Sequence, residues 1–308
     1  IFKNLYDKGY IYEGKKILMY CSRCETPLSN NEIAMDNSYK DVIEKTAYVK
    51  FKVKNNDNTY LLAWTTTPWT LIGNVALSVN SKLDYVKVKV KNEYYILAKD
   101  RLEILENKYE IIETFKGKKL LNTKYDQLYD INTDKKGFYV IDGGKEVSSE
   151  DGSGIVHMAV YGEFDYEMIK KYDLPIIQHL NNSGKLVLGP KDWHNFYFKK
   201  VNKYVLEDLE KKNQLLRIKE HKHSYPFCYR CDSPLFYNAV GSWFVDIQKI
   251  KSKLIERKKD IAWFPKNIET RFNYNLDNAP DWSISRNRFW ATAMPVWKCD
   301  NKKCKNLE

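Results

Sequence analysis

WTTTPWTLIGN, at residues 64–74, is the stretch from which the fold and function of this chain are best inferred. It holds four threonine hydroxyls, two tryptophans, one proline and one glycine within eleven residues. An ordinary buried strand does not need so many hydroxyls, and an ordinary loop does not need two tryptophans. Hydroxyls beside large apolar rings suit a wall that sizes and orients a small polar ligand. A threonine-rich strand that only reflects β-propensity is the simpler alternative.

The segments around this stretch have the alternation and turns of a sheet. Residues 47–53 and 60–64 predict one hairpin, and residues 85–90 and 94–98 predict a second. Further strands are expected at 109–115, 138–141 and 155–160, and helices at 1–9, 163–172, 201–212 and 247–259. Residues 46–218 are therefore predicted to form a strand-rich α+β domain that curls like a β-barrel.

Four of the six cysteines form two matching C-x-x-C motifs. The members are Cys21, Cys24, Cys228 and Cys231. Paired motifs of this kind have the spacing of zinc ligands, whereas a redox C-x-x-C occurs singly near a βαβ unit. We expect one structural Zn²⁺, because four thiolates leave no position for water, and a reducing, cytoplasmic setting. The looser pair Cys299 and Cys304 is either half of a second zinc ribbon or two free thiols.

The placement of the two motifs predicts a domain inserted into a host. The chain leaves the first motif, builds nearly two hundred residues and returns to the second. The predicted parts are a host-edge helix with the first zinc knuckle at 1–45, the inserted domain at 46–218, the second knuckle at 219–240, and the return to the host at 241–308. The start without methionine and the end within a cysteine motif suggest a piece of a longer chain.

The net charge of +11 permits an anionic partner such as RNA. Only 8 of the 51 basic residues are arginine, the residue that phosphate and base recognition favours. A partner surface and a solvated lysine coat are therefore both open. No apolar run reaches the roughly 18 residues of a membrane span, so no membrane association is expected.

Three segments resemble motifs of the isoleucyl-tRNA synthetases. Residues 64–74 resemble the threonine-rich editing motif, and GSGIVH at 152–157 resembles the second editing motif, which Asp165-Tyr166 closes. DWSISRNRFW at 281–290 is similar to the segment that follows the insertion in the class I catalytic domain. The valyl and leucyl enzymes have Thr-Thr-Arg-Pro where this chain has TTTP at 65–68.

The resemblance implies an editing domain inserted through a four-cysteine zinc neck into a Rossmann-type host. It implies hydrolysis of valyl-tRNA(Ile) by water, with the 3′ acceptor end of tRNA(Ile) and the rest of the synthetase in cis as partners. The nucleotide-binding signatures H-I-G-H and K-M-S-K-S are missing from this chain. The fragment is therefore not expected to aminoacylate, ATP and Mg²⁺ are expected only for the full-length enzyme, and the fragment is expected to be a monomer.

The resemblance also implies the site residues. The catalytic set is Asp165, His157, Thr66 and Thr67, and the substrate-binding set is Trp64, Thr65, Trp69, Thr70 and Asn74. Asp165 is expected to bind the α-ammonium group, and His157 to hold the substrate or ribose or to order the water. The division of roles among the threonines stays open.

Two other functions stay open beside the editing hydrolase. One is a non-catalytic module of the same synthetase that binds the tRNA acceptor end or serves as a zinc-bound structural unit. The other, weaker, is an acyl hydrolase with a threonine nucleophile, although no general base stands close to the threonines in sequence.

Overall fold

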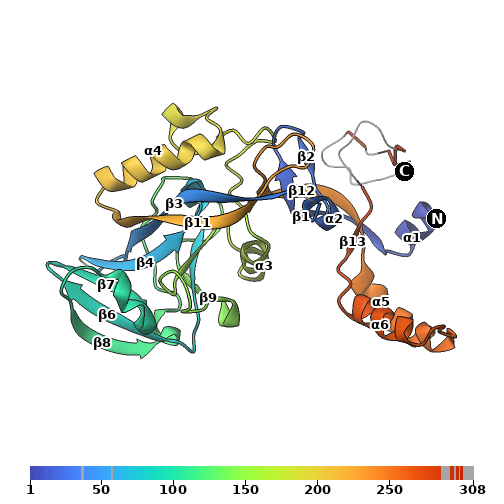
Figure 1. Ribbon diagram of the computed structural model, residues 1–308, viewed down its shortest axis with the longest axis horizontal. Coiled ribbons are helices and arrows are strands. Elements are labelled where there is room, and N and C mark those ends of the chain that lie inside the picture. Colours follow the sequence, from blue (N-terminus) through green and yellow to red (C-terminus); the bar gives the residue numbers. More distant parts are fainter. Residues whose placement is uncertain (36–37, 57, 286–291, 295, 298, 301–308) are drawn as a thin grey trace. The chain divides into compact units, whose positions relative to one another are not determined.

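The computed structural model describes residues 1–35, 38–56, 58–285, 292–294, 296–297 and 299–300 (Figure 1). Within it the chain forms two compact units. The larger unit runs from Ile17 to Ala239, and the smaller one contains Ile1–Lys16 and the chain from Val240 onward. Helices and strands are mixed throughout, so the fold class is α+β, as the sequence predicts.

The strands and helices have the following bounds. The strands are β1 (Ile11–Cys21), β2 (Thr26–Pro27), β3 (Tyr39–Lys52), β4 (Thr59–Thr65), β5 (Ala76–Val79), β6 (Asp84–Val90), β7 (Glu93–Ala98), β8 (Glu110–Lys116), β9 (Val140–Asp142), β10 (Val156–Met158), β11 (Leu215–Pro226), β12 (Phe236–Val245) and β13 (Trp282–Ser283). The α-helices are α1 (Phe2–Asp7), α2 (Asn30–Ile33), α3 (Glu163–Lys171), α4 (Phe198–Lys211), α5 (Ile247–Arg257) and α6 (Asn267–Asp277). The 3₁₀ helices are η1 (Pro68–Gly73), η2 (Lys99–Ile104), η3 (Gly117–Leu120), η4 (Gly144–Glu146), η5 (Lys191–Trp193) and η6 (Lys258–Asp260).

In the part of the chain that the structure describes, the larger sheet has nine strands. Its order is β8-β6-β7-β4-β10-β5-β9, and β11 and β3 join it through β4. β4 is the central strand: β3 pairs with one of its edges, and β7 and then β10 pair with the other. The β10–β4, β4–β7 and β5–β9 pairs are parallel, so the sheet is mixed.

Both predicted hairpins are confirmed. β3 pairs antiparallel with β4 from Ala47↔Thr65 to Lys52↔Tyr60, and β6 pairs antiparallel with β7. The second hairpin turns at Lys91, whose φ of +53° lies in the left-handed region that tight turns use. Apolar side chains of the two hairpins, including Leu62, Val86 and Leu97, form one buried cluster.

The long ribbon of β3 and β11 exceeds what the sequence predicts. β11 pairs with β3 from Leu215↔Val49 to Pro226↔Tyr39, and Figure 1 shows the two strands running together over their length. Much of the ribbon is solvated on both faces, so its residues do not show the apolar alternation by which strands are detected. The ribbon leads from the central strand to the cysteine motifs.

Helix α4 covers the region where β4 continues into η1. Its apolar residues Phe198, Val201, Val205 and Leu209 recur on one face and are all buried. The predicted helices at 163–172, 201–212 and 247–259 are confirmed as α3, α4 and α5, with α4 beginning three residues earlier than expected.

In the smaller unit, Asp281 joins two segments that are distant in sequence. Its carboxylate accepts hydrogen bonds from the Tyr12 hydroxyl at 2.6 Å and the Ile247 backbone N–H at 3.0 Å. Residues 281–285 of the predicted host-edge motif are described, and residues 286–290, like Cys304, lie outside the described residues. No helix among the described residues is long and apolar enough to span a membrane.

Candidate functional site

The stretch at 64–74 passes from the end of β4 into the 3₁₀ helix η1. Pro68 occupies the first turn of η1, where its fixed φ and missing N–H are tolerated. The Thr67 backbone N–H donates to the Thr65 hydroxyl at 3.1 Å, and the Thr70 hydroxyl donates to the Thr67 carbonyl at 2.7 Å. Two of the four threonines therefore hold the turn itself together.

The threonines converge on the imidazole of His157. Its Nε2 lies 3.1 Å from the Thr70 hydroxyl oxygen and 3.3 Å from that of Thr65. The Thr67 hydroxyl continues the series at 3.3 Å from the Thr70 oxygen. This contact follows from the sheet register, because β10 pairs with β4 at Val156↔Trp64 and so brings the next residues, His157 and Thr65, together on the opposite face.

Burial decides the charge of His157. The residue is buried, and desolvation lowers its pKa to about 4, so the imidazole is neutral at physiological pH. Its Nδ1 is covered and has no hydrogen-bond partner among the described residues. Thr65 and Thr70 are also buried, whereas Thr66 and Thr67 are half-buried. The half-buried Thr67 therefore forms the open edge of the cluster, and Thr66 precedes it in the chain.

Asp165 lies in the first turn of α3, directly after the loop that follows β10. One carboxylate oxygen accepts the Ala159 backbone N–H at 3.2 Å. Burial raises the pKa of Asp165 to about 7, although the hydrogen bond from Ala159 opposes the shift. Within the described residues no hydrogen bond joins Asp165 to the threonine and histidine cluster. Asp165 stands seven residues past Met158, the last residue of the strand that carries His157.

Trp64 lies on the other face of the sheet from Thr65 and His157. Its ring packs against Tyr48 and meets His221 edge-on, with ring centroids 6.4 and 5.8 Å apart. It belongs to the apolar cluster of the two hairpins. The structure therefore separates Trp64 from the other residues of its motif.

Trp69 and Asn74 are buried and make contacts within the fold. The Trp69 ring packs among Tyr161, Phe198 and Phe236, and its backbone N–H donates to the Asn202 side chain of α4 at 2.9 Å. The Asn74 amide donates to the Ala76 carbonyl at 2.9 Å and accepts from the Tyr125 hydroxyl at 2.8 Å. Both side chains hold η1 against its surroundings.

The GSG segment before His157 has a structural explanation. Ser153 donates its hydroxyl to the Leu62 carbonyl of β4 at 2.7 Å. Gly154 has a φ of +72°, and a Cβ there would lie 2.4 Å from the Cβ of Ala98. Only glycine fits this turn, which delivers His157 to the edge of β4.

Sequence reasoning missed two residues that brace the turn. Asn202 sits at an unremarkable polar position of α4, and no sequence signal marks it. His179 is fully buried, and a Cβ on Gly73 would lie 2.6 Å from its Nδ1. His179 stands among apolar residues in the segment 176–180, and this neighbourhood was the sequence signal for its burial.

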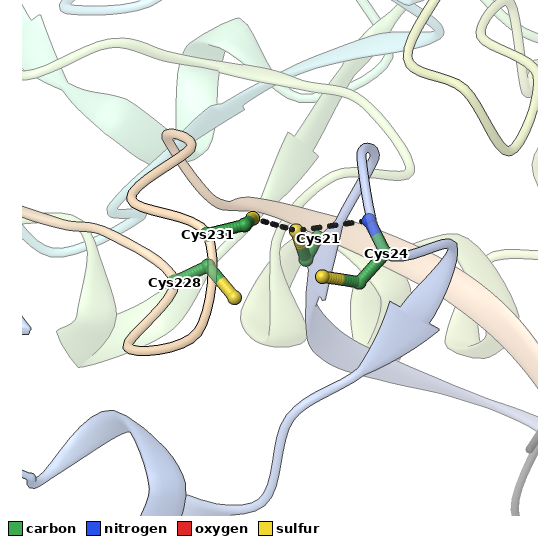
Figure 2. A group of neighbouring side chains, drawn as sticks. All are labelled: Cys21, Cys24, Cys228 and Cys231. Atoms are coloured by element: carbon green, nitrogen blue, oxygen red, sulfur yellow. Dashed lines mark hydrogen bonds between the residues drawn. The ribbon is translucent and has the colours of Figure 1, made fainter.

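The four predicted metal ligands come together in the larger unit. Their sulfur atoms all lie within 4.8 Å of one another, and Figure 2 shows the four side chains converging from two loops. Each loop ends in a left-handed residue directly after its second cysteine, Glu25 with φ +48° and Asp232 with φ +59°. The two motifs therefore share one local conformation, as matching knuckles should.

The donor set fits a tetrahedral zinc ion. Zn–S bonds of about 2.3 Å place the sulfurs of a tetrahedron about 3.8 Å apart. The Cys21 and Cys231 sulfurs lie 3.4 Å apart, close to that separation. Burial raises the pKa of the Cys21 and Cys24 thiols, whereas hydrogen bonds with Ser233, Cys21 and Cys24 outweigh burial at Cys231 and lower its pKa to about 7. A thiol with this pKa readily supplies the thiolate that zinc binds.

Comparisons with known proteins match the chain over nearly its full length. The sequence model of the family tRNA synthetases class I (I, L, M and V) matches residues 1–307. The isoleucine–tRNA ligase of Clostridium acetobutylicum is 48% identical over 301 residues, which is 97% of this chain and 29% of that protein. The corresponding enzyme of Sulfolobus acidocaldarius is 36% identical over 318 residues, which cover 100% of this chain and 30% of that enzyme.

A solved structure shows a more distant likeness. The P. knowlesi cytosolic leucyl-tRNA synthetase editing domain is 14% identical, with a TM-score of 0.45, over 56% of this chain and 95% of that one. The chain spans about 29% of the length of the isoleucine–tRNA ligase of Clostridium acetobutylicum. Because the family model matches residues 1–307, the chain belongs to the tRNA synthetases class I (I, L, M and V).

Proposed function

We propose that this chain is the editing part of an isoleucine–tRNA ligase and hydrolyses valyl-tRNA(Ile). The observation that carries the proposal is the cluster in which Thr65, Thr67 and Thr70 gather around His157, with Asp165 at the start of the next helix. The chain is 48% identical to an isoleucine–tRNA ligase, which supports isoleucine as the amino acid of the whole enzyme.

The need for such a site follows from the size of the two amino acids. Valine lacks one methylene of isoleucine, and a hydrophobic pocket discriminates on that difference by only about 1–3 kcal/mol. A second site that admits valine and excludes isoleucine by size removes the error. We assign to Thr66 and Thr67 the role of bounding the amino acid side chain, because both are half-buried and Thr67 adjoins the cluster.

The reaction needs little activation, because an aminoacyl ester is already reactive. The oxygen of a bound water attacks the ester carbonyl, the bond from that carbon to the ribose oxygen breaks, and the ribose oxygen takes up a proton. The products are valine and tRNA. Asp165, when ionised, pairs with the α-ammonium group and so orients the carbonyl toward the water.

We assign the remaining features to the same function. The barrel-like editing domain spans residues 46–218, inserted into a class I host whose edges are residues 1–45 and 241–308. Zn²⁺ on the four cysteines of the two knuckles cross-links both ends of the inserted domain. The partners are the 3′ end of tRNA(Ile) and the rest of the synthetase in cis, which binds ATP and Mg²⁺.

Deacylation of valyl-tRNA(Ile) by the purified, zinc-loaded chain tests the proposal, with isoleucyl-tRNA(Ile) as the control substrate. Valine should be released well above the buffer rate, and isoleucine should not. Asp165→Ala should abolish the activity, because the ammonium group loses its partner. Binding of tRNA without release of valine would instead favour the non-catalytic module, and equal release of both amino acids would contradict the size-exclusion site.

A further inference from the structure

We propose that His157 is a neutral positioning residue that donates its Nε2 proton to Thr70 and Thr65, and that it does not take the proton of the attacking water. The catalytic consequence rests on the proposed function. The assignment of the proton rests on the hydrogen bonds alone.

The Thr70 hydroxyl determines where the imidazole proton lies. A hydroxyl has one proton to donate, and Thr70 gives it to the Thr67 carbonyl at 2.7 Å, the shortest contact in the cluster. Toward His157 Nε2, at 3.1 Å, Thr70 can then only accept. Nε2 must therefore carry the proton, since two lone pairs at this distance would repel each other.

The other ring nitrogen supports the same tautomer. Nδ1 is covered, and within the described residues no acceptor lies in hydrogen-bond range of it. Nδ1 is a buried group without a partner in either tautomer, but buried N–H donors without a partner are rarer in proteins than unpaired acceptors, so the bare nitrogen is the more favourable state. With the proton on Nε2, one donor serves both Thr70 and Thr65, at 3.1 and 3.3 Å.

This tautomer leaves no accessible lone pair with which His157 could act as a base. The Nε2 position is occupied by its proton, and Nδ1 is closed off from any water or substrate. The imidazole holds the hydroxyl oxygen of Thr70 in place. That oxygen lies 3.3 Å from the hydroxyl oxygen of Thr67, at the open edge of the cluster. His157 thus fixes Thr70 and, through Thr70, the half-buried Thr67.

The first test reads the tautomer of the zinc-loaded chain by ¹⁵N NMR of its five histidines. The spectrum of His157→Gln identifies the resonances of residue 157 by their loss. We expect the His157 imidazole to be neutral and protonated at Nε2 at pH 7. A neutral form protonated at Nδ1, or a charged imidazolium, would overturn it, whether or not the chain hydrolyses any ester.

The second test separates a donor from a base by two substitutions. The amide nitrogen of His157→Gln reaches the place of Nε2 and can donate, whereas His157→Leu fills the space without a donor. We expect Gln to keep valyl-tRNA hydrolysis within about threefold and Leu to lose about 10–100-fold, the effect of one or two hydrogen bonds. A catalytic base would instead lose about 10²–10⁴-fold in both variants, which would contradict the proposal.

Discussion

At the scale of single residues, Asp165 combines burial with a charge that the proposed reaction needs. Burial raises its pKa to about 7, so the neutral carboxyl competes with the carboxylate near neutral pH. Binding an ammonium group favours the ionised form and lowers this pKa again. The residue is therefore poised to ionise when a substrate with a free amine arrives.

The pH dependence of the chain should report this group. The kcat/KM for valyl-tRNA should rise as pH increases through about 7, because only the carboxylate pairs with the ammonium group. The free energy of unfolding depends on pH in the opposite direction. Because folding raises the pKa of the Asp165 carboxyl, its protonated form stabilises the fold fully below about pH 4, and this stabilisation is lost as the pH rises through about 7.

The isosteric variant Asp165→Asn provides the control for both effects. It should have a low kcat/KM without the step near pH 7, and an unfolding free energy that changes less between pH 4 and 8. A variant whose pH–rate profile matched that of the unchanged chain would show that another group titrates.

Part of the predicted site set meets in the structure, but the placement of the individual side chains was not predictable. The motifs at 64–74 and 152–157 were enough to bring Thr65, Thr70 and His157 into one expected site. The sequence did not show that β4 continues to Thr65, and this strand places Trp64 on the opposite face. Adjacent residues of a strand point to opposite faces, so membership of a motif does not place a side chain in the site.

At the scale of elements, the 3₁₀ helix η1 carries the site and depends on what lies beneath it. The Trp69 backbone N–H binds η1 to α4 through the Asn202 side chain, and Gly73 lies close against the fully buried His179. Periodicity does not predict this turn, because its six residues are all buried and follow neither helical nor strand alternation. The two hairpins, by contrast, were predictable, because their alternation and turn residues are local features.

Gly73→Ala should destabilise the chain and disturb the site. The new Cβ would lie 2.6 Å from His179 Nδ1 and 3.1 Å from the Ile177 carbonyl oxygen, so the turn must shift. Overpacking of this kind costs about 1–3 kcal/mol in the free energy of unfolding, which urea denaturation measures.

Gly241→Ala is the matched control, because nothing lies within 4 Å of a Cβ at that position. Its unfolding free energy should stay within about 1 kcal/mol of the unchanged chain. If both substitutions had the same effect, the contact between Gly73 and His179 would not matter to stability.

At the scale of the whole molecule, the cysteine cluster connects the two ends of the larger unit. Cys21 follows the entry of the chain into this unit at Ile17, and Cys231 precedes its exit at Ala239. The spacing alone predicted that the four sulfurs would meet, because two matching knuckles require each other to complete a tetrahedron. The long ribbon that brings them together was not predictable, because its solvated strands lack apolar alternation.

Removing one ligand should release the metal and destabilise the larger unit. Elemental analysis of the purified chain should find about one zinc per chain, and Cys228→Ser should lose it. Zinc at 100 times its dissociation constant stabilises the folded chain by about 2.7 kcal/mol, and the variant should lack this stabilisation.

Cys299→Ser is the control, since Cys299 is an exposed free thiol outside the cluster. It should keep both the zinc and the stability of the unchanged chain. A fully folded chain without metal, or zinc retained at full occupancy by Cys228→Ser, would contradict the assignment.

The most direct test of the central claim is a crystal structure of the chain with a non-hydrolysable valyl-adenosine analogue, and with its isoleucyl counterpart as the control. The valyl ammonium group should lie against the Asp165 carboxylate, and Thr66 and Thr67 should bound the side chain, while the isoleucyl analogue should not occupy the site. A valyl analogue bound on the Trp64 face, or both analogues bound alike at the threonines, would contradict it.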